Sequence, residues 1–202
     1  MGGDVHKVIS ACPIFHKAKS QFHQDLYTPL PMPLKPWDDV SMHFIMALPG
    51  TQRGNDAIMV VVDKFSKMAH FILCYKTDDA SYVADLYFKE IVSLHGVPKT
   101  IISDRDSKFL SHLSRILWKL FGTKLLLGTV YHPQINGETK VTNQTLTTFL
   151  RSLVSKSLKD WDLKLPYVEF AYNRSPSYTT KHSPFECVYV VNPSLLWICC
   201  LF

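Results

Sequence analysis

The sequence has no run of apolar residues long enough to cross a lipid bilayer. Of its 202 residues 47% are hydrophobic, but no apolar segment approaches the roughly 20 residues that a membrane-spanning helix needs. The N-terminal stretch MGGDVHKVIS also lacks the apolar region that follows the charges of a secretion signal. We therefore expect a soluble intracellular protein, nuclear or cytoplasmic, with no membrane partner.

The sequence also lacks a regular set of cysteines and a long basic run. Its five cysteines are odd in number and irregularly spaced, so we expect reduced thiols. The 22 Lys and Arg residues exceed the 17 Asp and Glu residues, which gives a net charge of +5. This mild excess fits a polyanionic partner, and it fits an ordinary basic surface equally well. The last four residues, CCLF, match a prenylation signal formally, but no polybasic stretch precedes them and we do not expect prenylation.

Turn-forming residues divide the chain into a linker and a series of strands. Residues 27–36 carry four prolines, which favour an extended linker and a domain boundary. Three β-rich segments follow, with turn signals at 50–56 and 64–67 between them. Short connections predict an antiparallel meander. Its strands are expected at 39–48, 57–65 and 68–75, the first of them half-buried because its residues alternate in polarity.

Helical periodicity begins after the meander. A helix is predicted over 78–96, with Asp78 or Asp79 as N-cap and Gly96 at its end. The apolar face of this helix is expected to consist of Val83, Leu86, Tyr87, Ile91 and Leu94. Strands at 99–104 and 123–129 flank a second helix at 109–122, and helices are predicted at 138–156 and 159–173, where Pro166 is able to break or kink the last one. This order predicts an α/β fold with a five-stranded mixed sheet flanked by helices, most simply of the ribonuclease H type.

One carboxylate stands where a functional group is expected. Asp104 ends the strand at 99–104, and functional groups of open α/β sheets gather beyond the carboxyl ends of strands. The segment 103–106 fits a metal ligand, and it also fits a polar turn that caps the next helix. Thirty-five residues lie between Asp104 and Lys140, which is on the first turn of the predicted helix at 138–156.

Several stretches of the chain match one known family: PWDDVSM, TQRGNDAIMVVVDKFSKMAHFI, LHGVPKTIISDRDSKFLSH, YHPQ, LPYVEFAYNRS and SPFE. Through them the sequence, over about residues 27–193, closely resembles the integrase catalytic core of gypsy-type long-terminal-repeat retrotransposons. The resemblance implies a DNA partner and DNA insertion by two-metal phosphoryl transfer. It also makes a homodimer a candidate assembly. In that family two Asp residues and one Glu hold two Mg²⁺ or Mn²⁺ ions, whose preferred ligands are carboxylate oxygens.

The resemblance places the three metal-binding positions on His43, Asp104 and Lys140. Only Asp104 keeps the carboxylate, so any metal site there is expected to be weak or empty, and we expect no cofactor. An imidazole nitrogen offers one lone pair to one metal, and Lys140 replaces an anion with a cation. The sequence thus predicts a catalytically inactive core that binds DNA weakly and non-specifically, through residues that the pattern does not identify.

Two alternatives stay open. One is a residual metal-dependent polynucleotidyl transferase or nuclease, in which Asp63, Asp106 or Glu138 replaces a lost ligand. The other is an adapted protein-interaction module with an exposed apolar tail at 194–202. Both would use the same core domain at 37–193, after the linker at 27–36.

Residues 1–26 resemble a remnant of the family's N-terminal zinc finger. Cys12 matches the first cysteine of the finger and Phe15 stands in place of the second. The paired histidines of the pattern are missing, and His6, His16 and His23 do not supply them. A structural zinc site needs four ligands, so we expect none here and interpret the chain as a degenerate fragment of a retrotransposon polyprotein.

Overall fold

The computed structural model describes residues 33, 35–46, 48–103, 107–127, 148, 159–177, 180–191 and 193. All of them lie in the compact unit Met32–Phe202. The predicted finger remnant at 1–26, the tail at 194–202 and nearly all of the predicted helix at 138–156 lie outside these residues. Within the described part of the chain, no helix is long and apolar enough to span a membrane, and neither Cys74 nor Cys187 forms a disulfide.

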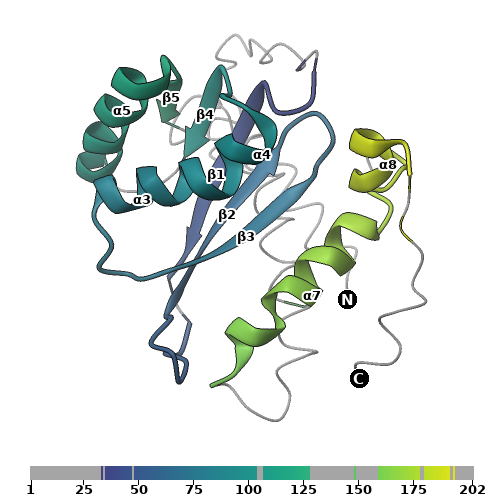
Figure 1. Ribbon diagram of the computed structural model, residues 1–202, viewed down its shortest axis with the longest axis horizontal. Helices are drawn as coiled ribbons and strands as arrows, with labels where there is room; N and C mark the ends of the chain where they lie inside the picture. Colours follow the sequence, from purple (N-terminus) through teal and green to yellow (C-terminus); the bar gives the residue numbers. More distant parts are fainter. Residues whose placement is uncertain are drawn as a thin grey trace, which may run out of the picture. The chain divides into compact units, whose positions relative to one another are not determined.

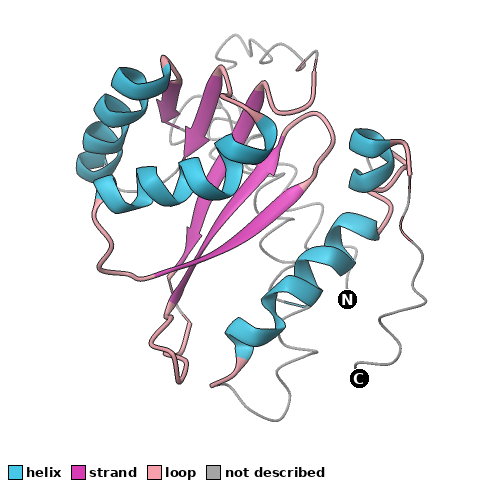
Figure 2. Cartoon of the chain, in the orientation of Figure 1, coloured by secondary structure: helices cyan, strands magenta, loops and turns pink. Residues whose placement is uncertain are grey.

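Five strands form one mixed sheet in the order β3-β2-β1-β4-β5 (Figures 1 and 2). β1 pairs antiparallel with β2 and parallel with β4, β2 pairs antiparallel with β3, and β4 pairs parallel with β5. The predicted five-stranded mixed sheet and its meander are therefore confirmed. The strands are β1 (Asp39–Ile45), β2 (Ala57–Asp63), β3 (Ala69–Cys74), β4 (Thr100–Ser103) and β5 (Lys124–Leu127).

Helices pack against the sheet from two sides and divide the core into two clusters. On one side α3 (Ala80–Tyr87), η1 (Phe88–Val92), α4 (Ser93–His95) and α5 (Ser107–Phe121) cover alternate residues of β2 such as Met59 and Val61. On the other side α7 (Trp161–Arg174) covers Ile58, Val60 and Val62. A short helix, α8 (Pro184–Tyr189), follows α7 and packs against it (Figure 1).

β1 is buried on both faces, contrary to the half-buried strand that its sequence predicts. Ser41 and His43, the polar residues of the pattern, are both buried. They are paired with Val62 and Val60 of β2 and share their face of the sheet, which α7 covers. The alternation of polar and apolar residues therefore marks two buried faces of different chemistry, and one of them encloses His43.

The helix predicted at 78–96 contains a π-helical turn. Asp79 is its N-cap and accepts a hydrogen bond from the Tyr82 N–H, and the turn follows at Phe88–Val92. In a continuous α-helix Leu94 would lie on nearly the same face as Tyr87, since seven residues make almost two full turns. Because a π turn takes more residues per turn, the register shifts by one residue. Leu94 is 64% exposed, which corrects its predicted place on the buried face, and His95 faces the sheet instead.

α7 continues through Pro166, so the predicted helix survives without a break. The proline removes one backbone donor, but tertiary contacts hold the start of the helix. The Trp161 indole N–H donates to the Pro49 carbonyl at 2.8 Å, and the Asn55 amide donates to Asp162 at 3.1 Å. Burial on its own raises the pKa of Asp162, but the hydrogen bonds that it accepts, first among them that of Asn55, hold the pKa below its ordinary value.

Candidate functional site

His43 occupies the centre of β1, opposite Val60 of β2. Its side chain is 2% exposed. β4 runs parallel beside β1, with Ser103 next to Met42, and ends there. Asp104 and Lys140, the other two positions that the resemblance assigns to metal binding, lie outside the described residues. Their clustering with His43 at one edge of the sheet therefore stays a prediction.

The side chain at His43 does not fit the bridging position of a two-metal site. Its imidazole can give one lone pair to one ion, whereas a bridging carboxylate has two oxygens. Mg²⁺ and Mn²⁺ also prefer hard oxygen ligands. Among the residues that the structure describes, no group of three or more His, Cys, Asp or Glu side chains is placed to hold a metal ion.

Asp63, the one described candidate for replacing a lost carboxylate, is committed to a structural role. It is 0% exposed at the end of β2. One carboxylate oxygen accepts hydrogen bonds from the backbone N–H groups of Trp37 (2.9 Å) and Phe65 (3.3 Å). The other accepts from the N–H (2.9 Å) and hydroxyl (2.5 Å) of Ser66. Asp63 also lies beside Val40, three residues along β1 from His43, so it holds a turn and does not complete the site.

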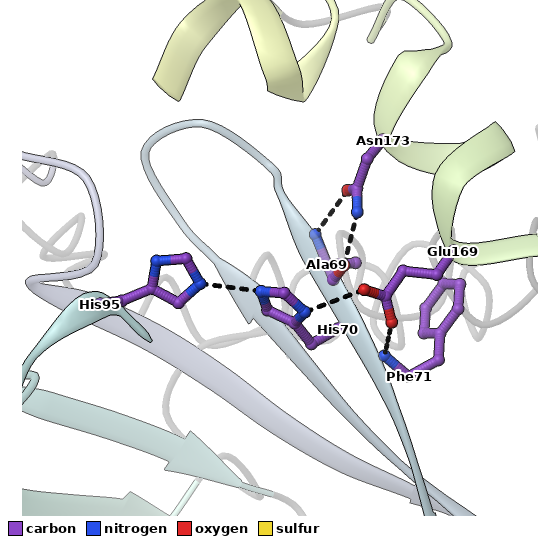
Figure 3. Close-up of polar contacts among 6 residues, drawn as sticks. All are labelled: Ala69, His70, Phe71, His95, Glu169 and Asn173. Atoms are coloured by element: carbon purple, nitrogen blue, oxygen red, sulfur yellow. Dashed lines mark hydrogen bonds and ion pairs between the residues drawn. The ribbon is translucent and has the colours of Figure 1, made fainter. Parts of the chain in front are cut away.

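A different cluster of polar side chains joins α7 to the free edge of β3 (Figure 3). The Asn173 amide accepts a hydrogen bond from the Ala69 N–H and donates one to the Ala69 carbonyl, both at 2.8 Å. One turn earlier, Glu169 accepts from the Phe71 N–H at 2.7 Å. Four residues of helix rise about 6 Å, and two residues of strand span about 6.6 Å. The two side chains therefore match successive outward-facing groups of the strand.

Glu169 also begins a chain of contacts to two histidines (Figure 3). It lies 2.9 Å from Nδ1 of His70, and Nε2 of His70 lies 2.8 Å from Nε2 of His95. The Trp37 ring stacks on the His95 ring with centroids 3.7 Å apart and an interplanar angle of 5°. Trp37 itself has a φ of 65°, a left-handed conformation that is strained for a bulky residue. Four separate segments thus meet at the two imidazoles.

Burial, followed by the charge of His70, lowers the pKa of His95 to about 4. The face of Trp37 acts in the opposite direction, because an aromatic face attracts a cation by about 0.5–1 kcal/mol at exposed sites. That is less than the 1.36 kcal/mol of one pKa unit. Burial and His70 therefore outweigh the stacking, and His95 is neutral at pH 7.

The sequence alone does not reveal this cluster. Trp37, His70, His95, Glu169 and Asn173 all lie within the stretches that carry the family resemblance. Their spacing gives no signal, since the residues come from four separate segments and the π turn decides which residue of the helix faces the sheet. The one feature that these five residues share in the sequence is that they lie in the stretches that resemble the family.

We expect Asn173→Leu to lower the free energy of unfolding by about 2–6 kcal/mol. The substitution leaves the N–H and carbonyl of Ala69 buried without their partner, and each unmet buried group costs about 1–3 kcal/mol. Urea unfolding measures the change. Leu163→Ala is the control, because Leu163 is an exposed residue of the same helix and its change should stay within about 0.5 kcal/mol. Equal effects of the two substitutions would contradict the edge contact.

Comparison with known proteins adds sequence relatives and fold neighbours. No family model matches the sequence. The Tf2-3 and Tf2-4 transposon polyproteins of Schizosaccharomyces pombe are each 34% identical to it in an alignment of 197 residues, and each alignment covers 95% of this chain. The chain spans 14% of the length of these curated relatives.

Solved structures of retroviral integrases share the fold. The HTLV-2 integrase catalytic core in complex with magnesium, in its trimeric form, has a TM-score of 0.60 and 16% identity over 77% of this chain and 99% of that one. The core of BIV integrase has a TM-score of 0.55 and 18% identity over 74% of this chain and 92% of that one. A simian T-cell lymphotropic virus intasome has a TM-score of 0.64 and 17% identity over 81% of this chain and 57% of that one. The chain is therefore homologous to a segment of the Tf2 retrotransposon polyproteins, and its ribonuclease H-like fold is that of retroviral integrase catalytic cores.

Proposed function

We propose that this chain is an integrase-type core that binds DNA weakly and non-specifically and lacks two-metal catalysis. The observation that carries the proposal is the buried imidazole of His43 at the centre of β1, the position that the resemblance assigns to the first metal-binding Asp. A buried imidazole cannot move to another part of the site to let a water-bound ion take its place. The metal ligand lost at position 43 therefore cannot be replaced by a movement of the His43 side chain within the sheet.

Electrostatics at the third position supports the same proposal. If Lys140 lies about 5 Å from a divalent ion, an effective dielectric of 20 gives a repulsion of roughly 6–7 kcal/mol before the side chain moves away. Movement of the lysine reduces this repulsion, but it does not restore a ligand. With Asp104 as the one remaining carboxylate, the formal charge of the three positions is 0 in place of −3.

The solved neighbours supply the contrast for this proposal. The HTLV-2 integrase core was determined with magnesium, in a trimeric and in a dimeric form. We propose that this chain also self-associates but does not bind the magnesium ion. Light scattering in the presence and absence of Mg²⁺ tests both points, and the expected result is an assembly state that does not change with the ion.

The test of catalytic inactivity is the response of the unmodified chain to Mn²⁺. We expect its melting temperature to be the same with Mn²⁺ and with EDTA, and labelled duplex DNA to stay uncleaved in both. A clear rise in melting temperature with Mn²⁺, together with cleavage, would support the alternative of a residual polynucleotidyl transferase or nuclease. An adapted protein-interaction module would instead show as a specific partner retained after nuclease treatment.

DNA binding is expected to be weak and sensitive to salt. Each phosphate contact contributes about −0.9 to the slope of log K against log salt concentration. With a net charge of +5 spread over the chain, we expect about three contacts or fewer, a slope no steeper than about −3, and a Kd of roughly 10⁻⁴–10⁻⁶ M. Fluorescence anisotropy with two unrelated duplexes measures slope and preference. Binding that ignores salt, or that clearly prefers one duplex, would contradict the proposal.

A further inference from the structure

We propose that His70 and His95 form a proton-controlled latch, in which one shared proton holds α4 and Trp37 against β3 and α7 and a second proton releases them. This inference does not depend on DNA binding or on the metal-binding positions. It rests on the contacts of His70 with His95 and Glu169 (Figure 3) and on the stacking of Trp37 on His95.

The geometry allows one hydrogen between the two rings. A carboxylate accepts hydrogen bonds, so Nδ1 of His70 donates to Glu169. The two Nε2 atoms, 2.8 Å apart, then share a single hydrogen, which His70 donates to the lone pair on Nε2 of a neutral His95. A second hydrogen would make both atoms donors, and neither could accept. The bond would be lost and two imidazolium cations would face each other.

The groups around the pair compensate one positive charge. Glu169 reaches it from α7 and is fixed by the Phe71 N–H, so it neutralises a proton on His70. β2 presents the apolar Val61 beside His70, and the uncharged Trp37 covers His95. The carboxylate of Asp63, at the end of β2, accepts hydrogen bonds from the Trp37 N–H and from the N–H and hydroxyl of Ser66. Among the residues that the structure describes, a second charge on His95 therefore has no carboxylate partner of its own. Burial, together with the charge of His70, lowers the pKa of His95 to about 4.

Release of the latch would act on the segment that leads into β1. Trp37 is held in a left-handed conformation by its stacking on His95 and by its N–H bond to Asp63. Without the stacking, the cost of that conformation favours rearrangement of the turn before β1. The π turn of the same helix, which brings His95 to the sheet, is a feature often found at functional sites.

The decisive experiment is an NMR titration of the full chain from pH 8 to pH 3.5. Variants His95→Gln and Trp37→Phe assign the ring signal of His95 and the indole N–H signal of Trp37. We expect the His95 ring to titrate near pH 4, and the Trp37 signal to move with the same midpoint. A His95 ring that titrates near 6.5, the ordinary value for histidine, would overturn the proposal.

The pH dependence of stability gives a second, independent readout. His95 has a lower pKa in the folded chain than in the unfolded chain, so the unfolded state binds more protons between about pH 6.5 and pH 4. Lowering the pH through this window should raise the unfolding constant of the parent relative to His95→Gln by roughly 10- to 100-fold, after allowance for the partial exposure of His95.

The matched control for the stability measurement is His112→Gln, which removes an exposed histidine of α5. It should leave the pH dependence of the parent in place. If His95→Gln keeps that dependence as well, or keeps the shift of the Trp37 signal at low pH, another group is responsible and the latch is wrong.

Discussion

Replacing His43 with Asp and Lys140 with Glu is expected to make the stability of the protein depend on Mn²⁺. The double variant rebuilds three carboxylates around Asp104. Metal binding to the folded state stabilises it by RT ln(1 + [L]/Kd), about 2.7 kcal/mol at a hundredfold excess over Kd. Without metal we expect the double variant to be less stable than the parent, because the carboxylates repel one another and the one introduced by His43→Asp is buried. Thermal melts with Mn²⁺ and with EDTA measure both effects.

The single variants and one matched double variant show where the response comes from. His43→Asp restores one ligand and keeps the cation, and Lys140→Glu removes the cation and keeps the imidazole, so each alone should recover little and the effects should be strongly non-additive. His43→Asn with Lys140→Gln makes the same two changes in shape without the charges and should not respond. A response of the unmodified chain as large as that of the carboxylate double variant would show that the native site already binds metal, and the inactive-core proposal would fall.

Asp63→Ala is expected to lower the free energy of unfolding by about 3 kcal/mol or more. The substitution leaves three backbone N–H groups without their acceptor, those of Trp37, Phe65 and Ser66, and each buried donor left unmet costs about 1–3 kcal/mol. Asp63→Asn should cost nearly as much, because one acceptor oxygen becomes a donor that faces other donors. Urea unfolding at neutral pH measures both changes.

Asp85→Ala is the control for Asp63, since Asp85 is an exposed carboxylate of α3 and its loss should stay within about 0.5 kcal/mol. The same variants separate structure from metal binding. If Asp63 replaced a lost metal ligand, its removal would abolish a response to Mn²⁺ and have little effect on the metal-free protein. A small effect of Asp63→Ala in EDTA would therefore contradict the structural role given to it here.

Most of the fold could be predicted from the sequence because its local signals agree with one another. β-branched runs, turn residues and the helix caps at Asp79 and Gly96 place the meander, the first helix and the mixed sheet correctly. Helical periodicity does not predict the short α8, although SPFE carries its capping box, in which the side chains of Ser183 and Glu186 each accept a hydrogen bond from the other residue's backbone N–H. Pro166 was an ambiguous signal, since the contacts that fix α7 come from the distant residues Pro49 and Asn55.

The candidate site was less predictable because its chemistry depends on contacts between distant segments. The pattern assigned His43 to the sheet, but the burial of its strand on both faces follows from the packing of α7. The meeting of His70 with His95 depends on a π turn that helical periodicity does not reveal, which is why Leu94 was expected on the face that His95 occupies. Asp63 read as a spare carboxylate, and only its four hydrogen bonds identify it as the centre of a turn.

The side chains that α7 places along the edge of β3 also protect the sheet from pairing with other chains in a crowded solution. A bare edge strand is a template on which another chain can add a strand and start an aggregate, and the strand AHFILC is apolar enough to stack in this way. Here Asn173 and Glu169 occupy the outward groups of Ala69 and Phe71. Exchange of these two amide hydrogens with solvent should therefore follow detachment of α7, and a chain that loses this helix by proteolysis would expose the edge to its neighbours.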